Sequence, residues 1–227
     1  MDVPFSTPTA LLYLELGIFP LRYTIQAKRI MFLRYIMTRS EGDLLKEFLD
    51  AQCREPSKND WCLSVLKDLE ELDFEVAYET VKYFSKESLS KEVKKSCRDK
   101  AFDDLMSKQE EYSKGSSLEY GQLRMRSYLK STSINSTEAK LIFKFRSRMV
   151  RVKNNFRGSY SNNLDCPLGC PNQIDSQEHL INCQNNLNSS NVSQDEYEVL
   201  FGMNEEKMKP VILKLKQILE DRKNKLD

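Results

Sequence analysis

Apolar side chains recur every three or four positions along most of the chain, a spacing that predicts amphipathic helices. Pro20 stands where the first turn of a helix tolerates proline, and the pattern continues to the SEGD sequence after Arg39. We therefore expect a helix over residues 20–38. The stripe that predicts it consists of Leu21, Ile25, Lys28, Phe32 and Ile36.

Capping residues mark the starts of further helices. Ser40 with Asp43 resembles a capping box before LLKEFLDAQ, and the loop at Pro56 precedes a helix over WCLSVLKDLEEL. Ser85 opens a longer helix that we expect to reach residue 111. The apolar positions of this helix recur every four residues, at Leu89, Val93, Cys97, Ala101 and Leu105.

The C-terminal half repeats the helical pattern. Asn135 and Glu138 form an N-cap pair that introduces a helix over residues 137–156, and shorter helices are expected over 194–201 and 204–224. No long run alternates apolar and polar residues in the manner of a strand. The expected fold is all-α, a helical bundle with a small zinc knuckle near the C-terminus, for the reasons given below.

Composition agrees with a helical protein that does not enter membranes. The 227 residues are 40% hydrophobic and 30% charged, with seven glycines and seven prolines. The net charge is +1, so no global field attracts nucleic acid, and a charged partner has to be recognised by local clusters. No apolar run is long enough for a bilayer, and the N-terminus lacks the features of a signal peptide. We expect an intracellular protein, nuclear or cytoplasmic, without a membrane partner.

The cysteines and the single histidine supply the most specific chemical signal. Cys166, Cys170, His179 and Cys183 follow the spacing Cys-x3-Cys-x8-His-x3-Cys. In a reducing compartment such a cluster is more often a metal site than a disulfide pair. Three thiolates and one imidazole complete the tetrahedral ligand set of a structural Zn2+ site, with no position left open for catalysis.

The residues around these ligands favour the same interpretation. Pro and Gly around the first cysteine pair favour a tight turn, and Asp175 or Ser176 can cap a short helix from which His179 and Cys183 project on one face. The segment from Cys166 to Cys183 is called the knuckle below. The alternative is that these thiols are buried as small hydrophobic groups, although the neighbouring Asn, Gln, Ser, Asp and Glu residues offer little core.

The other three cysteines lack a metal-ligand pattern. Cys53, Cys62 and Cys97 are scattered over expected helices and have no second histidine or paired spacing nearby. We expect buried or indifferent thiols at these positions.

A strongly basic segment precedes the knuckle. Between Ala139 and Leu164 there are seven cations and no acid, and the cations flank both edges of an apolar stripe through Ile142 and Phe145. Cations that reach phosphates would make binding salt-dependent, so this helix is a candidate nucleic-acid surface. A solvated amphipathic face is the alternative. The seven residues are Lys140, Lys144, Arg146, Arg148, Arg151, Lys153 and Arg157.

These features suggest three parts along the chain. Residues 1–130 form a helical, linker-like domain, residues 131–185 carry the basic helix and the knuckle, and residues 186–227 hold the C-terminal helices. The knuckle should fold only with its metal bound, because so few apolar residues cannot bury enough surface alone.

The order of these blocks resembles a known family. The runs STPTALLYLELGIFPLRYTIQAKRIMFLRYIMTR, KNDWCLSVLKDL and LIFKFRSRMVRVKNNFRGSY, followed by the Cys-Cys-His-Cys cluster, resemble the region after the polymerase in non-LTR retrotransposon polyproteins of the restriction-like-endonuclease type. The likeness covers residues 5–185. It implies a helical linker and a zinc knuckle that help to hold template RNA or target DNA, with the four ligands named above carrying Zn2+.

The catalytic motifs of such polyproteins do not occur in this sequence. Ala101 stands where a reverse transcriptase needs an aromatic residue before its Asp-Asp pair, here Asp103 and Asp104. No proline is followed by aspartate, as the endonuclease requires, and the only histidine is assigned to the metal. A glycine-rich phosphate loop is also absent. We expect no enzymatic activity.

Two functional hypotheses remain. The first is a zinc-containing nucleic-acid-binding module, a separated or truncated C-terminal piece of a retroelement protein. The second is a zinc-stapled helical scaffold that binds protein. The acid-free basic segment favours the first, whereas the net charge of +1 and the acidic run DLEELDFEVAYE favour the second.

Overall fold

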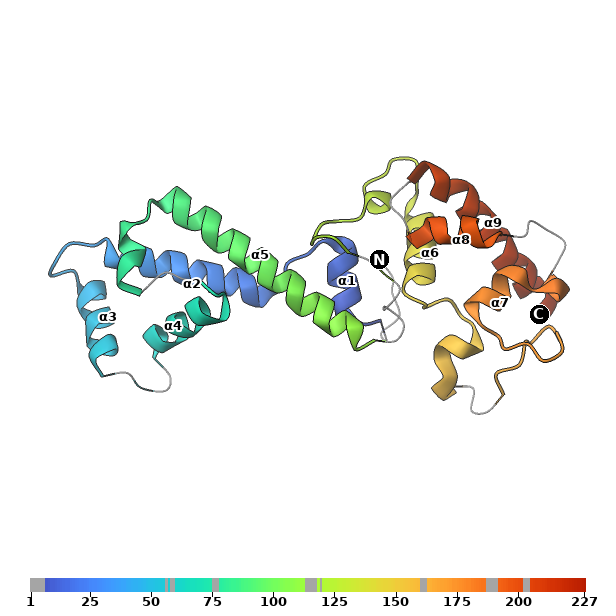
Figure 1. The fold of residues 1–227 in the computed structure, drawn as a ribbon, viewed down its shortest axis with the longest axis horizontal. Coiled ribbons are helices and arrows are strands. Elements are labelled where there is room, and N and C mark those ends of the chain that lie inside the picture. The colour runs from blue at the N-terminus through green and yellow to red at the C-terminus, as the bar shows by residue number, and fades with distance from the viewer. Residues whose placement is uncertain are drawn as a thin grey trace. The chain divides into compact units, whose positions relative to one another are not determined.

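The computed structural model confirms the all-α class (Figure 1). Among the residues it describes there is no strand, only an isolated antiparallel bridge between Asp165 and Ile174. No helix among these residues combines the length and the apolar character needed to span a membrane. The described residues are 7–55, 57, 60–74, 78–112, 118, 120–159, 163–186, 192–201 and 205–227.

The chain divides into two compact units by its internal contacts. Ile18–Met106 forms the first, called the hairpin unit here. Met1–Gly17 and Ser107–Asp227 together form the second, called the knuckle unit. The boundaries at 130 and 185 that the sequence suggested stay predictions about which parts fold independently.

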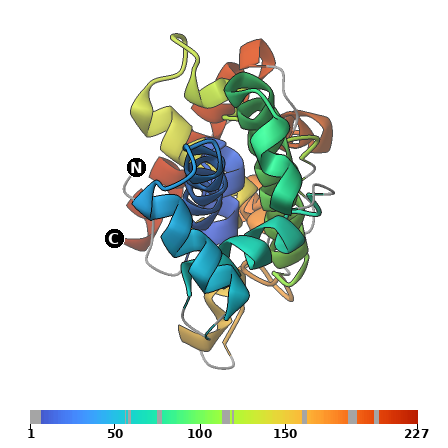
Figure 2. The same cartoon turned by 90° about the vertical axis from the view of Figure 1, so that its left-hand side faces the viewer.

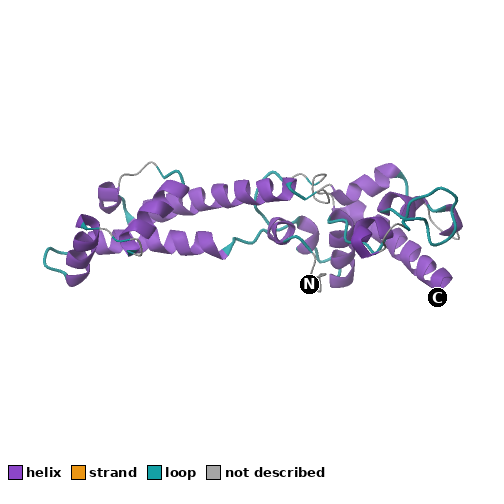
Figure 3. Ribbon diagram, turned by 90° about the horizontal axis from the view of Figure 1, so that it is seen from below, coloured by secondary structure: helices purple, strands orange, loops and turns teal. Residues whose placement is uncertain are grey.

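Helices α2 (Leu21–Met37) and α5 (Lys86–Glu110) lie antiparallel in the hairpin unit (Figure 1 and Figure 3). Helices α3 (Leu44–Arg54) and α4 (Trp61–Glu71) contact each other, and both contact α2. Figure 2 shows α2 along its axis. A 3₁₀ helix, η1 (Tyr78–Tyr83), precedes α5. The helices expected over 20–38, after Asp43, from Trp61 and from Ser85 are therefore confirmed to within a few residues.

The face of α2 that packs inward differs from the expected stripe. Tyr23, Ile30 and Leu33 are buried, whereas Leu21 is 68% exposed and Phe32 is 45% exposed. The helix is apolar on more than one side, so periodicity detects a stripe without deciding which stripe the neighbouring helices cover. The exposed Phe32 ring instead packs edge-on against Trp61, with ring centroids 5.6 Å apart.

The knuckle unit contains α1 and everything that follows α5. The sequence did not indicate α1, and it did indicate α6, α7, α8 and α9. The elements are α1 (Thr9–Leu16), η2 (Ser127–Leu129), α6 (Ser136–Arg146), η3 (Lys153–Ser159), α7 (Gln177–Asn182), η4 (Gln184–Asn186), α8 (Gln194–Glu198), η5 (Val199–Phe201) and α9 (Glu205–Leu226).

One hydrophobic core joins η2, α6, α7, α8, η5 and α9. It includes Phe145 from α6, Leu180 and Ile181 from α7, and Val211 and Leu215 from α9, all almost fully buried. Because α7 belongs to the knuckle, the knuckle is packed onto the same core as the basic helix. The prediction that the knuckle folds only with its metal bound did not take this packing into account.

Helix α6 ends ten residues earlier than expected, at Arg146 rather than residue 156. Its start is as predicted, with a capping box between Asn135 and Glu138. At the end, Met149 N donates to Lys144 O at 2.8 Å and Arg148 N to Phe145 O at 3.3 Å, while Arg148 adopts φ 51°. These are the bonds of a Schellman motif, which stops the helix although an arginine occupies the usual glycine position.

Candidate metal centre

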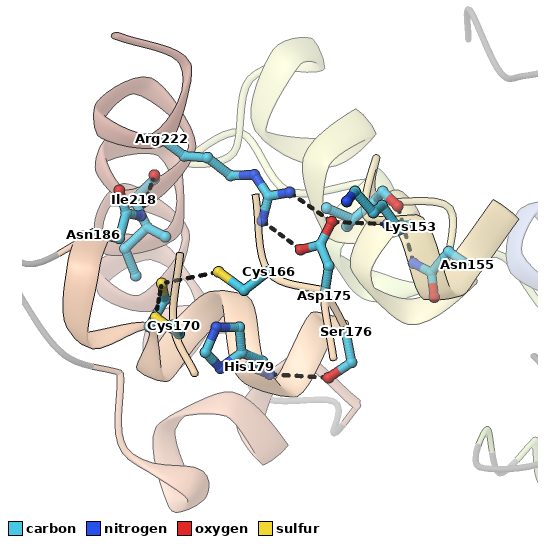
Figure 4. A network of polar contacts seen from close by, with 12 residues as sticks. Lys153, Asn155, Cys166, Cys170, Asp175, Ser176, His179, Asn186, Ile218 and Arg222 are labelled. Carbon is cyan, nitrogen blue, oxygen red and sulfur yellow. Dashed lines mark hydrogen bonds and ion pairs between the residues drawn. The ribbon is translucent and has the colours of Figure 1, made fainter. Parts of the chain in front are cut away.

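The four predicted ligands meet in space. One ligand atom from each of Cys166, Cys170, His179 and Cys183 lies within 4.8 Å of the others (Figure 4). The Sγ atoms of Cys166 and Cys183 are 3.9 Å apart, and those of Cys170 and Cys183 are 3.5 Å apart. Bonds of about 2.3 Å to a tetrahedral zinc ion place two sulfurs ~3.8 Å apart. The arrangement therefore has the dimensions of a tetrahedral metal site.

A closed turn positions the first two cysteines. Cys166 N donates to Gln173 O at 2.8 Å, and Gly169 N donates to Cys166 O at 3.1 Å. Gly169 adopts φ 78°, a conformation that glycine reaches without strain, which accounts for a glycine in this turn. Burial opposes ionisation of the Cys170 thiol, but hydrogen bonds from the backbone of Asn185 and from neighbouring thiols lower its pKa below the usual value. These hydrogen bonds favour the thiolate of Cys170, which is the form that binds metals, whereas burial raises the pKa of Cys183.

A short helix positions the histidine. Ser176 caps α7, and its Oγ accepts a hydrogen bond from His179 N at 3.0 Å. Cys183 follows the helix at φ −67° and ψ 111°, so the expectation that both ligands project from one helical face is corrected. Helix α7 is only six residues long, and the extended backbone at Cys183 returns the thiol toward the other ligands.

The state of His179 fits a metal ligand. Its Nε2 atom is buried and has no hydrogen-bond partner among the described residues. Burial lowers the pKa of His179, against the opposing influence of Asp175, so the imidazole is neutral near pH 7. A neutral imidazole with an unsatisfied buried nitrogen is the form that coordinates a metal ion.

Asp175 fastens the knuckle to α9. Its carboxylate accepts two hydrogen bonds from Arg222, each 2.7 Å long, and a third from Lys153 N at 2.9 Å (Figure 4). Asn186 adds a bond from its Nδ2 to Ile218 O at 2.9 Å. The sequence offered Asp175 only as an alternative helix cap, because its partner Arg222 lies 47 residues away.

The predicted basic residues have separate environments. Lys140 and Lys144 lie on α6, and Arg151 is exposed in the chain after the helix. Arg148 forms an ion pair with Glu178 at 2.9 Å, and Lys153 Nζ lies 3.2 Å from Asn163 Oδ1. The side chain of Arg157 falls outside the described residues.

Arg146 was predicted to belong to the nucleic-acid surface, and its burial corrects that prediction. It is 1% exposed, its Nε donates to Glu15 at 2.9 Å, and one terminal nitrogen donates to Leu200 O at 2.6 Å. The hydroxyls of Tyr120 and Tyr128 also donate to Glu15, at 2.7 Å each. Burial tends to lower the pKa of Arg146, but Glu15 raises it, so the guanidinium stays charged within the core. It is not available to a phosphate.

A groove between α6 and α9 adds lysines that the sequence did not single out. Its volume is about 630 Å³. Lys140 and Lys144 line it from α6, and Lys216 and Lys223 line it from α9. In sequence, the α9 lysines belong to an ordinary mixed-charge helix, and only the packing of the two helices brings them to the basic segment.

Comparison of the chain with models of known protein families, with curated proteins and with solved structures finds no match. The function must therefore be argued from the site itself.

Proposed function

We propose that this protein is a zinc-containing nucleic-acid-binding module. The observation that carries the proposal is the convergence of three cysteines and one histidine within 4.8 Å, beside a helix, α7, that shares a core with the basic helix α6. In this proposal the four ligands hold Zn2+ as a structural ion, because all four tetrahedral positions are filled from the protein. The ion positions the backbone and takes no part in catalysis.

The nucleic-acid surface that we propose comprises the cations of the basic segment other than Arg146, together with the groove between α6 and α9. Arg146 is omitted because it is paired with Glu15 in the core. Arg148 would exchange its partner Glu178 for a phosphate, a small cost for an ion pair with both side chains partly exposed. The proposed contacts are Lys140, Lys144, Arg148, Arg151, Lys153, Arg157, Lys216 and Lys223.

The sequence resemblance supplies the biological frame of the proposal. We propose that the chain is a separated or truncated piece of a non-LTR retrotransposon polyprotein that binds template RNA or target DNA without polymerase or endonuclease activity. The order of the sequence blocks supports this origin, and the metal site beside the basic segment supports binding.

A gel-shift titration tests the proposal. The zinc-loaded chain is mixed with single-stranded RNA or duplex DNA between about 50 and 200 mM salt. Binding should weaken with salt, with a slope of about −0.9 per phosphate contacted on duplex DNA. Replacing Lys140 and Lys144 by Gln should reduce affinity and slope, and replacing Lys91 and Lys95, exposed on α5, serves as the matched control. The same affinity for both variants would contradict the proposed surface.

The second candidate is a zinc-stapled scaffold that binds protein. Exposed apolar side chains on α3 favour it, since Leu44 is 79% exposed and Phe48 is 61% exposed. The same titration separates the two functions. Absence of any shift at low salt, from a chain shown to contain zinc, would reject nucleic-acid binding and favour the scaffold.

A further inference from the structure

A ligand-sized slot lies between α2 and α5, within the hairpin unit. Its volume is about 450 Å³, within the range of small-molecule sites. Phe19, Ala27 and Met31 line it from the side of α2, and Val93 and Cys97 line it from α5. The surface of the slot is therefore largely apolar.

Two polar groups at the base of this slot already have partners. Tyr23 is 2% exposed, and its hydroxyl donates to Asp104, which does not line the slot. Cys97 is 1% exposed and its Sγ lies 3.5 Å from Tyr23 O. Burial raises the pKa of Cys97 to about 11, so its thiol is neutral near pH 7. Thr24 and Ser90 add two hydroxyl groups to an otherwise apolar lining, so the inserted part of a bound molecule should be mainly apolar.

The rim of the slot is cationic. Lys28 lies on the α2 side, and Lys94 and Arg98 lie on the α5 side. No carboxylate lines the slot, and none of these three cations has an ion-pair partner among the described residues. Lys94 and Arg98 are four residues apart on one helix, a spacing at which like charges repel.

Two other cations of α2, Arg22 and Arg29, are paired with acids. Arg29 contacts Asp68 at 2.7 Å, and Arg22 contacts Asp104. The three cations around the slot have no such partner within the described part of the chain, so positive charge is left unbalanced beside an apolar surface.

We propose that the slot binds an amphiphilic organic anion, with an unbranched hydrocarbon chain on the apolar floor and a carboxylate between Lys28 and the pair Lys94 and Arg98. An anion relieves the repulsion across the rim, and the chain displaces water from the floor. The volume of the slot lies within the range of small-molecule sites, which suits a single-chain amphiphile. This function is independent of the nucleic-acid surface, which lies in the other unit.

Titration of the isotope-labelled, zinc-loaded full chain with decanoate, followed by two-dimensional NMR, tests the proposal. Amide signals of α2 and α5 around the slot should shift and saturate. Two controls separate the parts of the ligand: 1-decanol has the chain without the charge, and butyrate has the charge with little chain. Each should bind at least tenfold more weakly than decanoate.

Variants place the binding in the slot. Replacing both Lys94 and Arg98 by Gln should weaken decanoate binding at least tenfold. Replacing Lys91 and Lys95 by Gln removes the same charge at the same spacing of α5 outside the slot, and should leave binding unchanged. Ala27→Phe fills the floor and should abolish binding, with circular dichroism used to verify that α2 and α5 remain folded.

Three outcomes would overturn the proposal. The first is that decanoate and 1-decanol bind with equal affinity. The second is that both charge variants lose decanoate affinity to the same extent. The third is that decanoate gives no saturable shift while an acidic amphipathic peptide binds the slot. The gel-shift result for the basic segment does not bear on these outcomes, so the two proposals succeed or fail separately.

Discussion

Glu15 holds the polar centre of the knuckle unit together. Its carboxylate accepts hydrogen bonds from Arg146, Tyr120 and Tyr128, and the two ionised side chains are almost fully buried. Such a buried ion pair adds little to stability when compared with well-packed apolar side chains in place of both partners. Removal of one partner is costly, because the other charge is left buried without compensation.

Replacing Glu15 by Gln should therefore lower the free energy of unfolding of the knuckle unit by about 3–5 kcal/mol. The measurement is a urea titration followed by hydrogen exchange in α6 and α9. Glu92→Gln, an exposed acid on α5, is the control and should change stability by less than about 0.5 kcal/mol. Equal losses of stability in the two variants would mean that Arg146 is solvated. Its omission from the proposed nucleic-acid contacts would then be wrong.

Residue by residue, the sequence was informative where the chemistry is local. The four ligands were recognised because they fall within one short segment with metal-ligand spacing, and the structure brings their ligand atoms together. Arg146 was misassigned because its partner lies 131 residues away, and no pattern within a helix distinguishes a cation that faces solvent from one that faces a distant acid.

At the scale of elements, the end of α6 depends on Arg148. This residue holds φ 51° in the Schellman motif, a conformation that costs an L-residue about 1–2 kcal/mol. Arg148→Gly should remove that cost but also the exposed ion pair with Glu178, which contributes little. The net effect should be a rise of about 1 kcal/mol in the free energy of unfolding. Glu178→Gln measures the contribution of that ion pair separately in the same urea titration. A fall in stability for Arg148→Gly larger than the effect of Glu178→Gln would contradict the assignment of strain.

Arg222 links α9 to the metal centre through Asp175. Replacing a group that hydrogen-bonds a metal ligand typically changes metal affinity by about 10–100-fold, and Arg222 acts one step further out, so its effect should lie at the lower end. Arg222→Met leaves the Asp175 carboxylate buried without its cation, so we expect zinc affinity to fall about tenfold in a competition titration with a chromophoric chelator. Lys223→Met, on the exposed side of the same helix, should leave the affinity unchanged. Equal affinities in the two variants would mean that α9 does not support the site.

Long, regular elements were predictable and short or irregular ones were not. Helices α2 and α5 contain enough turns for their periodicity to be read, although of the stripe that indicated α2 only Ile36 is buried. Helix α1 has only eight residues, almost all of them apolar, so no polar face marks it as a helix. The end of α6 was missed because an arginine replaces the glycine that usually signals a Schellman motif.

For the whole molecule, the division into units is discontinuous in the sequence. Residues 1–17 belong with residues 107–227, because Glu15 on α1 is bound by residues that follow position 107. Helix α5 runs from Lys86 to Glu110 across the boundary between the units, so no linker of polar or flexible composition marks it. Reasoning along the chain cannot detect a unit whose parts are joined only by tertiary contacts.

Removal of the metal tests this division. In the zinc-loaded chain, addition of a chelator should increase hydrogen exchange in the knuckle and in α7, because four ligands that hold the turn and the helix together lose their common partner. The increase should extend to α6 and α9, since Leu180 and Ile181 pack on their core, and should not reach α2 or α5 within the hairpin unit. Cys170→Ser should reproduce the pattern, with Cys62→Ser as a control that leaves the metal content unchanged. Exchange that rises equally in both units would show that the chain unfolds as one body and would contradict the division.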